Sequence, residues 1–203
     1  MVDNFNLIKK LLKFESEDDF YFVQILQRKK DNPGVIKGTN NNNRLIKAYY
    51  IKSVEQLEKY KEEMIALANI FNARVGINLN KRSFYKTAFN TLKKISEQLH
   101  NRNFHNVATA YNTACGVANT DDRIWILDVD SKEISPIMMS FINLECEPIE
   151  KHTLFGSPSK ILAVLPTKVG YHLITKPFDT REFVKRYPEV EIHRNNPTNL
   201  YIP

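Results

Sequence analysis

The sequence is poor in cysteine and has no long hydrophobic run. Cys115 and Cys146 are the only cysteines, and neither lies at zinc-finger spacing from a second cysteine or a histidine. The chain therefore specifies neither a disulfide scaffold nor a structural zinc site, and we expect a reducing, cytoplasmic setting. Apolar stretches such as residues 123–129 and 160–166 are far shorter than the roughly 20 residues that cross a bilayer, so no contact with a membrane is predicted.

The sequence also lacks a large excess of one charge. Its 29 Lys and Arg residues stand against 23 Asp and Glu, for a net charge of +6. This excess suits a polyanionic partner, but many proteins that bind none have it too. A chain of 203 residues, 42% of them hydrophobic, can bury one substantial core but hardly two, so we expect residues 1–203 to form one compact unit.

The first half alternates helical and strand patterns. Helical spacing covers residues 4–14, 53–72 and 83–100, and strand patterns cover residues 20–27, 48–51 and 73–79. Ser53 and Gln56 form a capping box at the start of the second helix. Residues 48–79 thus form a strand-helix-strand unit.

The helix at residues 83–100 has one apolar face and several cations. The residues predicted to point inward are Phe84, Ala88, Leu92, Ile95 and Leu99, and those predicted to point largely outward are Arg82, Lys86, Lys93 and Lys94. These cations form either a solvated face or a contact with nucleic acid. Arg82 and Lys86 are the candidates for the second role.

The second half is denser in strands. Strands are predicted at residues 124–130, 161–165, 171–175, 190–193 and 200–202, and helices at 134–144 and 180–187. This order predicts an α+β fold in which helices pack on one side of a sheet, as in the split β-α-β arrangement. The boundary between the two parts falls near residues 101–122, so we expect residues 1–100 and 101–203 as the two parts.

Two carboxylates follow the most apolar strand. In a strand, Asp128 and Asp130 project to the same face and lie about 7 Å apart. Carboxylates so close repel each other unless a cation lies between them, and oxygen ligands suit Mg²⁺ or Mn²⁺. The alternative is that the two residues simply begin a solvated turn.

A glycine and a histidine open the strand at residues 171–175. Gly170 allows the backbone to come close to a ligand, and Lys168 and His172 can both face a triphosphate. An isolated histidine on a strand is, however, more often a structural hydrogen-bonding residue.

A third carboxylate lies in the strand at residues 190–193. Glu191 and His193 point to the face opposite Val190 and Ile192. Glu191 is either a third metal ligand or part of the polar face of an edge strand.

Taken in order, an apolar strand ending in Asp-x-Asp, a Gly-x-His strand and a short strand with an acid resemble the catalytic core of archaeo-eukaryotic primases. The resemblance covers residues 70–203, and the unit before it is similar to the family's accessory module. It implies an RRM-like antiparallel core in which Asp128, Asp130 and Glu191 are catalytic and bind two Mg²⁺ or Mn²⁺ ions. It also implies that His172 contacts the phosphates of the incoming nucleotide.

The family pattern implies a DNA-directed primase or polymerase that acts on a single-stranded DNA template with NTP or dNTP. A replicative helicase partner is then either a separate chain or absent. The chain departs from that pattern because Gly170 replaces a small hydroxyl residue, so one hydrogen bond is either missing or supplied by Thr167 or Lys168. The third acid is Glu rather than Asp.

Two other functions fit the same residues. A catalytically silent primase-like protein would bind nucleic acid or initiate replication without synthesis. A metal-dependent nuclease would use the paired carboxylates for hydrolysis. A rolling-circle nicking enzyme normally needs paired histidines, and the sequence has no His-x-His.

Overall fold

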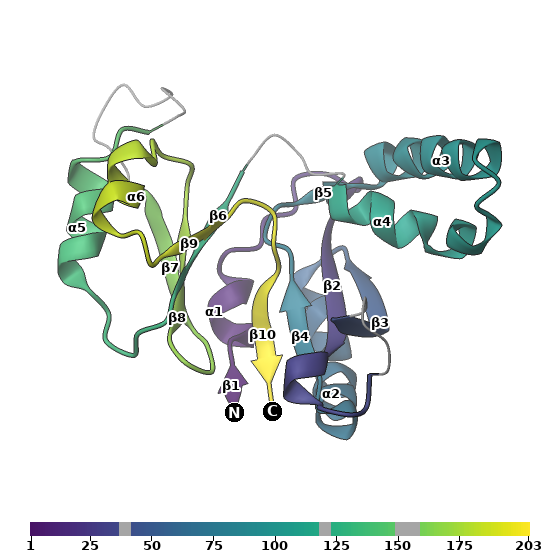
Figure 1. Cartoon of the computed structure of the whole chain (residues 1–203), viewed down its shortest axis with the longest axis horizontal. Coiled ribbons are helices and arrows are strands. Elements are labelled where there is room, and N and C mark those ends of the chain that lie inside the picture. Colours follow the sequence, from purple (N-terminus) through teal and green to yellow (C-terminus); the bar gives the residue numbers. More distant parts are fainter. Residues whose placement is uncertain (37–41, 118–122, 149–158) are drawn as a thin grey trace.

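A computed structural model describes residues 1–36, 42–117, 123–148 and 159–203. The fold is α+β, as predicted, with antiparallel strands in two sheets and helices packed against them (Figure 1). No helix in these ranges is both long and apolar enough to cross a membrane.

The first sheet has the strand order β1-β10-β4-β2-β3, and a short strand, β5, pairs with β2. Its strands are β1 (Val2–Asp3), β2 (Asp19–Arg28), β3 (Asn43–Ile51), β4 (Arg74–Ile77), β5 (Arg82–Ser83) and β10 (Thr198–Ile202). Two helices, α1 (Phe5–Lys9) and α2 (Val54–Phe71), pack against one face of it. The predicted capping box begins α2, because the Ser53 hydroxyl accepts the Gln56 N–H and the Gln56 side chain accepts the N–H of Lys52.

The second sheet has the order β7-β8-β6-β9. Its strands are β6 (Trp125–Val129), β7 (Ile161–Pro166), β8 (Tyr171–Thr175) and β9 (Glu191–His193). The helices α5 (Pro136–Leu144) and α6 (Arg181–Arg186) contribute Phe141 and Phe183 to a core with Leu127 and Leu173. The order strand-helix-strand-strand-helix-strand is the connectivity of split β-α-β folds.

The other face of the second sheet meets the first sheet. Ile126 and Ile174 lie in the same buried cluster as the core of the first sheet. At this junction the buried Asn4 side chain donates hydrogen bonds to the carbonyls of Pro166 and Asn199, both at 2.9 Å. Because strand side chains alternate, one face of β6 and β8 packs under helices while the opposite face is turned toward β2, β4 and β10.

The assignment of elements to the two sheets differs from the predicted division at residue 100. The last strand, β10, follows the second sheet in sequence but lies between β1 and β4 in the first. The helix α4 (Ala110–Val117) also belongs with the first sheet, because Cys115 packs against Phe20 and Phe22 and the Tyr50 hydroxyl contacts the Asn112 side chain at 2.7 Å. No local sequence pattern reports these long-range pairings.

The helix α3 (Phe84–His100) lies beside α4 and the short 3₁₀ helix η2 (Phe104–Thr109), at the end of the molecule far from α5 and α6 (Figure 1). Its predicted inward face is only partly covered, since Phe84 is half-buried against Phe20 and Ile95 is half-buried. Ala88, Leu92 and Leu99 are exposed, and Thr87 is the buried residue of the helix. The expectation was wrong for these three residues because α3 turns a more polar side toward its neighbours and leaves much of its apolar face uncovered.

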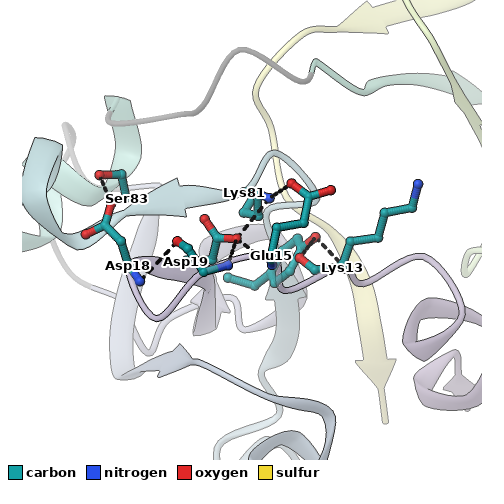
Figure 2. Close-up of polar contacts among 8 residues, drawn as sticks. Lys13, Glu15, Asp18, Asp19, Lys81 and Ser83 are labelled. Atoms are coloured by element: carbon teal, nitrogen blue, oxygen red, sulfur yellow. Dashed lines mark hydrogen bonds and ion pairs between the residues drawn. The ribbon is translucent and has the colours of Figure 1, made fainter.

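A charged cluster fastens the N-terminal segment to the start of α3 (Figure 2). Lys81 Nζ lies 2.8 Å from a Glu15 carboxylate oxygen and 3.0 Å from one of Asp19. Burial raises the pKa of Asp19, but hydrogen bonds from backbone N–H groups and Lys81 outweigh it and hold the pKa below its ordinary value. Next to it, Asp18 accepts the Ser83 hydroxyl and, at 2.8 Å, the N–H of Tyr85 in the first turn of α3.

Candidate active site

The three motifs predicted from the sequence meet in one row across the second sheet. Asp128 on β6 is the direct cross-strand partner of His172 on β8 and of Glu191 on β9. Directly opposed residues in antiparallel strands project to the same face, with Cβ atoms about 4.5–5.5 Å apart. The sheet register therefore brings together residues that are 63 positions apart in the chain (191 minus 128).

The central contact of this row joins His172 and Asp128. The His172 Nε2 atom lies 3.4 Å from Asp128 Oδ1. The interaction with the imidazole lowers the pKa of Asp128 below its ordinary value, against the opposing effect of burial, and the charges of His193 and Arg28 act in the same direction. Asp128 is therefore held as a carboxylate in a positive environment.

The other nitrogen of the same ring contacts the first sheet. His172 Nδ1 lies 2.8 Å from the Thr198 hydroxyl on β10, and both residues are buried. The imidazole is thus held between a carboxylate of one sheet and a hydroxyl of the other. This bond supports the structural alternative for His172, and it also leaves the ring oriented toward Asp128.

Glu191 has its own histidine neighbour. Its carboxylate lies 3.4 Å from His193 Nε2, and His193 Nδ1 lies 3.0 Å from the Asn196 side chain. About 75% of the Glu191 side chain is exposed, so it has room to turn toward Asp128. Asp130 follows the end of β6 and is exposed.

These residues line a cavity of about 770 Å³. One wall comes from the second sheet and carries Asp128, Asp130, His172, Glu191 and His193. The opposite wall comes from the first sheet and the segments beside it and carries Leu26, Arg28, Lys30, Asp31, Asn43, Arg74 and Gly76. Cations therefore face carboxylates across an open space, an arrangement suited to a ligand with both metal-binding and phosphate groups.

The predicted Lys168 lies in the turn that precedes β8 and lines the cavity. In this turn the Thr167 N–H donates to the Gly170 carbonyl at 2.9 Å, and the Thr167 hydroxyl accepts the Gly170 N–H at 3.0 Å. The hydroxyl of Thr167, which also lines the cavity, is therefore partly engaged within the turn.

Gly170 has a different role from the predicted one. A Cβ atom at this position would lie 1.9 Å from the Val129 carbonyl oxygen and 2.7 Å from the Ser131 nitrogen. The missing side chain therefore lets the turn pack on the backbone on either side of Asp130 rather than on a ligand, and the residue does not line the cavity. The prediction of a close backbone approach was right, but its partner is the Asp-x-Asp segment.

Arg82 is not on the surface, contrary to the prediction. It is fully buried in β5, and its Nη2 atom donates to the Asn195 side chain at 2.7 Å and to the Gly116 carbonyl at 3.3 Å. Burial lowers its pKa to about 10. Arg82 thus joins three distant segments and is closed to nucleic acid, whereas Lys86 is exposed on α3 and does not line the cavity.

Sequence reasoning missed the cationic wall of the cavity. Arg74 makes a two-point contact with Asp31 at 2.7 and 2.9 Å, and this bond, with the nearby charges of Arg28 and Lys168, holds the pKa of Asp31 low despite burial. Arg28 comes at the end of an apolar strand, as Asp130 does, and this position was the available signal.

The carboxylates fit a divalent cation in chemistry but do not converge on one point. No three of the His, Cys, Asp and Glu side chains in the described ranges lie close enough to hold a metal ion together. Asp128 and Glu191 each face an imidazole instead. Because Glu191 is directly opposite Asp128, turning its exposed side chain would bring the two carboxylates within reach of one ion.

Comparison with models of known families, with curated proteins and with solved structures finds no match to this chain.

Proposed function

We propose that this protein is a metal-dependent nucleotidyl transferase of the primase-polymerase type that makes or extends strands on single-stranded DNA. The observation that carries the proposal is the row of His172, Asp128 and Glu191 on three adjacent strands, at the wall of a cavity lined with cations. The strand order of the second sheet supports an RRM-like core beneath this row. The resemblance to primases rests on the order of the motifs along the chain. The pairing of His172, Asp128 and Glu191 on adjacent strands is a second observation, made in space.

In this proposal Asp128, Asp130 and Glu191 hold Mg²⁺ or Mn²⁺, and His172 and Lys168 contact the triphosphate of an NTP or dNTP. When bound, the metal supplies charge neutralisation at the phosphates and a more acidic 3′-hydroxyl. Divalent cations commonly use one or two carboxylates together with substrate phosphates, so a complete ligand set forms only with the nucleotide present.

The first sheet would supply the rest of the nucleotide site. Arg28 belongs to this wall, and its positive charge lowers the pKa of both Asp128 and Asp31. Arg74 is already paired with Asp31, which leaves Arg28 and Lys30 as the cations of this wall best placed to take phosphate oxygens. Binding and orientation are thus shared between the two sheets.

The direct test is incorporation of labelled nucleotides on single-stranded DNA with Mg²⁺ or Mn²⁺, with and without a primer. We expect synthesis by the wild type and at least a 100-fold loss in Asp128→Asn/Asp130→Asn, since charge stabilisation is usually the largest catalytic contribution. Glu182→Gln, which changes an exposed carboxylate outside the cavity, is the matched control. Equal synthesis by the double variant and this control would contradict the proposed site.

A second candidate is a catalytically silent relative that binds nucleic acid. It is favoured by the pairing of Asp128 and Glu191 with histidines rather than with each other. It predicts DNA binding that does not depend on a divalent cation, and no incorporation by the wild type. Nucleotide binding distinguishes the two candidates, because the first requires binding of dNTP or NTP that depends on Mg²⁺ or Mn²⁺ and that Arg28→Ala weakens.

A further inference from the structure

The helix α3 carries an apolar face that nothing in the described structure covers. Tyr85, Phe89, Leu92 and Leu99 are 67%, 56%, 64% and 50% exposed. Their spacing of four, three and seven residues places them on one side of the helix. With a rise of about 1.5 Å per residue, the stripe is about 21 Å long. Contiguous exposed apolar surface of this kind marks interaction sites.

The face belongs to a helix that is firmly held. Its N-terminus is capped twice, since the Ser83 hydroxyl accepts the Lys86 N–H at 3.0 Å and Asp18 accepts the Tyr85 N–H. The Tyr85 and Phe89 rings contact each other, with centroids 4.7 Å apart. A capped helix with an ordered aromatic pair is prepared for binding, because less conformational entropy is lost on association.

The pattern of the exposed residues is that of a short heptad repeat. Tyr85, Leu92 and Leu99 recur every seven residues and occupy one core position (d) of the heptad. Phe89, four residues after Tyr85 and three before Leu92, occupies the other core position (a). Along one edge of this stripe, Lys86, Lys93 and His100 recur with the same period and are all exposed. In coiled coils such flanking positions select partners by opposite charge.

The geometry points to α3 as a docking surface for an amphipathic helix of a partner protein whose apolar stripe is flanked by acidic residues. A second copy that docks through its own α3 supplies no such acids, because Glu97 is the single acidic residue of α3 and lies outside the stripe and its flank. Single-stranded nucleic acid would need bases to stack on aromatic rings along the stripe, and Leu92 and Leu99 provide none. This surface is separate from the cavity and independent of the proposed activity.

The test uses the full chain and two labelled synthetic helices, each 21 residues long with Leu at the core heptad positions. One has Glu at every flanking position and the other has Lys. By fluorescence anisotropy we expect the chain to bind the Glu-flanked peptide at least tenfold more tightly. Phe89→Gln/Leu92→Gln should weaken this binding at least tenfold, whereas Ile70→Gln, which changes an exposed residue of α2, should leave it unchanged.

A charge reversal gives the sharper result. Lys86→Glu/Lys93→Glu keeps the apolar stripe, so it should reverse the preference and bind the Lys-flanked peptide. Equal affinity for both peptides, no binding to either, or binding that survives Phe89→Gln/Leu92→Gln would overturn the proposal. So would a dimer, or single-stranded DNA binding, that the same double variant abolishes, because either result assigns the face to another occupant. Far-UV circular dichroism of each variant checks that α3 is intact.

Discussion

The substitution Gly170→Ala tests the packing that holds the Asp-x-Asp segment in place. The new methyl carbon would lie 1.9 Å from the Val129 carbonyl oxygen and 2.7 Å from the Ser131 nitrogen, and both atoms are backbone. Ordinary contact needs about 3.5 Å, so the turn before β8 has to move by about 1.5 Å or displace Asp130. Overpacking of this kind typically costs about 1–3 kcal/mol.

The control for this variant is Gly116→Ala in α4. A Cβ at Gly116 meets nothing within 4 Å, and alanine is favoured over glycine inside a helix by about 1 kcal/mol. Urea denaturation should therefore show a lower free energy of unfolding for Gly170→Ala and an equal or higher one for Gly116→Ala. If both variants unfold at the wild-type urea concentration, the close approach of the turn to residues 129–131 is not a constraint. We also expect nucleotide incorporation to fall in Gly170→Ala under conditions in which it remains folded.

Two further predictions concern buried polar contacts. Thr198→Val removes the hydroxyl that contacts His172 and should lower the free energy of unfolding by about 1–3 kcal/mol. A double-mutant cycle with His172→Phe should show a coupling of about 1 kcal/mol, and strictly additive losses would contradict the contact. The lowered pKa of Asp19 contributes stability that is present above its ordinary value of 3.8 and is lost as the pH falls through the native value. Urea denaturation between about pH 2 and 5 should therefore show a shallower acid-side loss for Asp19→Asn, which cannot titrate, than for Glu62→Gln, and identical slopes would contradict the assignment.

The local elements and the chemistry of the row were predictable from the sequence. Alternation along the strand that contains Asp128 identifies a buried strand with a polar end, and the same rule selects the face of His172 and Glu191. In a sheet with the split β-α-β order, these strands are neighbours. Predicting this row of residues therefore required only local sequence patterns and one assumption about the order of the strands.

The opposite wall of the cavity was not predictable in the same way. Arg28 and Arg74 reach the site because β2 pairs with β4 and the first sheet packs on the second, and local periodicity carries no information on such pairings. Arg82 shows the converse error. Its position just before an amphipathic helix suggests that it belongs to the cationic face of that helix. Instead it lies in β5, before the N-cap Ser83, and its side chain is buried in the interior.

The position of β10 also has a consequence for how the protein folds. This strand is inserted between β1 and β4, so the first sheet stays incomplete until residues 198–202 have been synthesised. Pairing between segments nearly 200 residues apart carries a large loop-closure cost and slows folding. Until then β4 has an open edge that other chains can pair with, so a ribosome-bound intermediate is vulnerable to aggregation. The Thr198 hydroxyl that orients His172 belongs to this strand, so the candidate active site is incomplete until β10 has paired with β4.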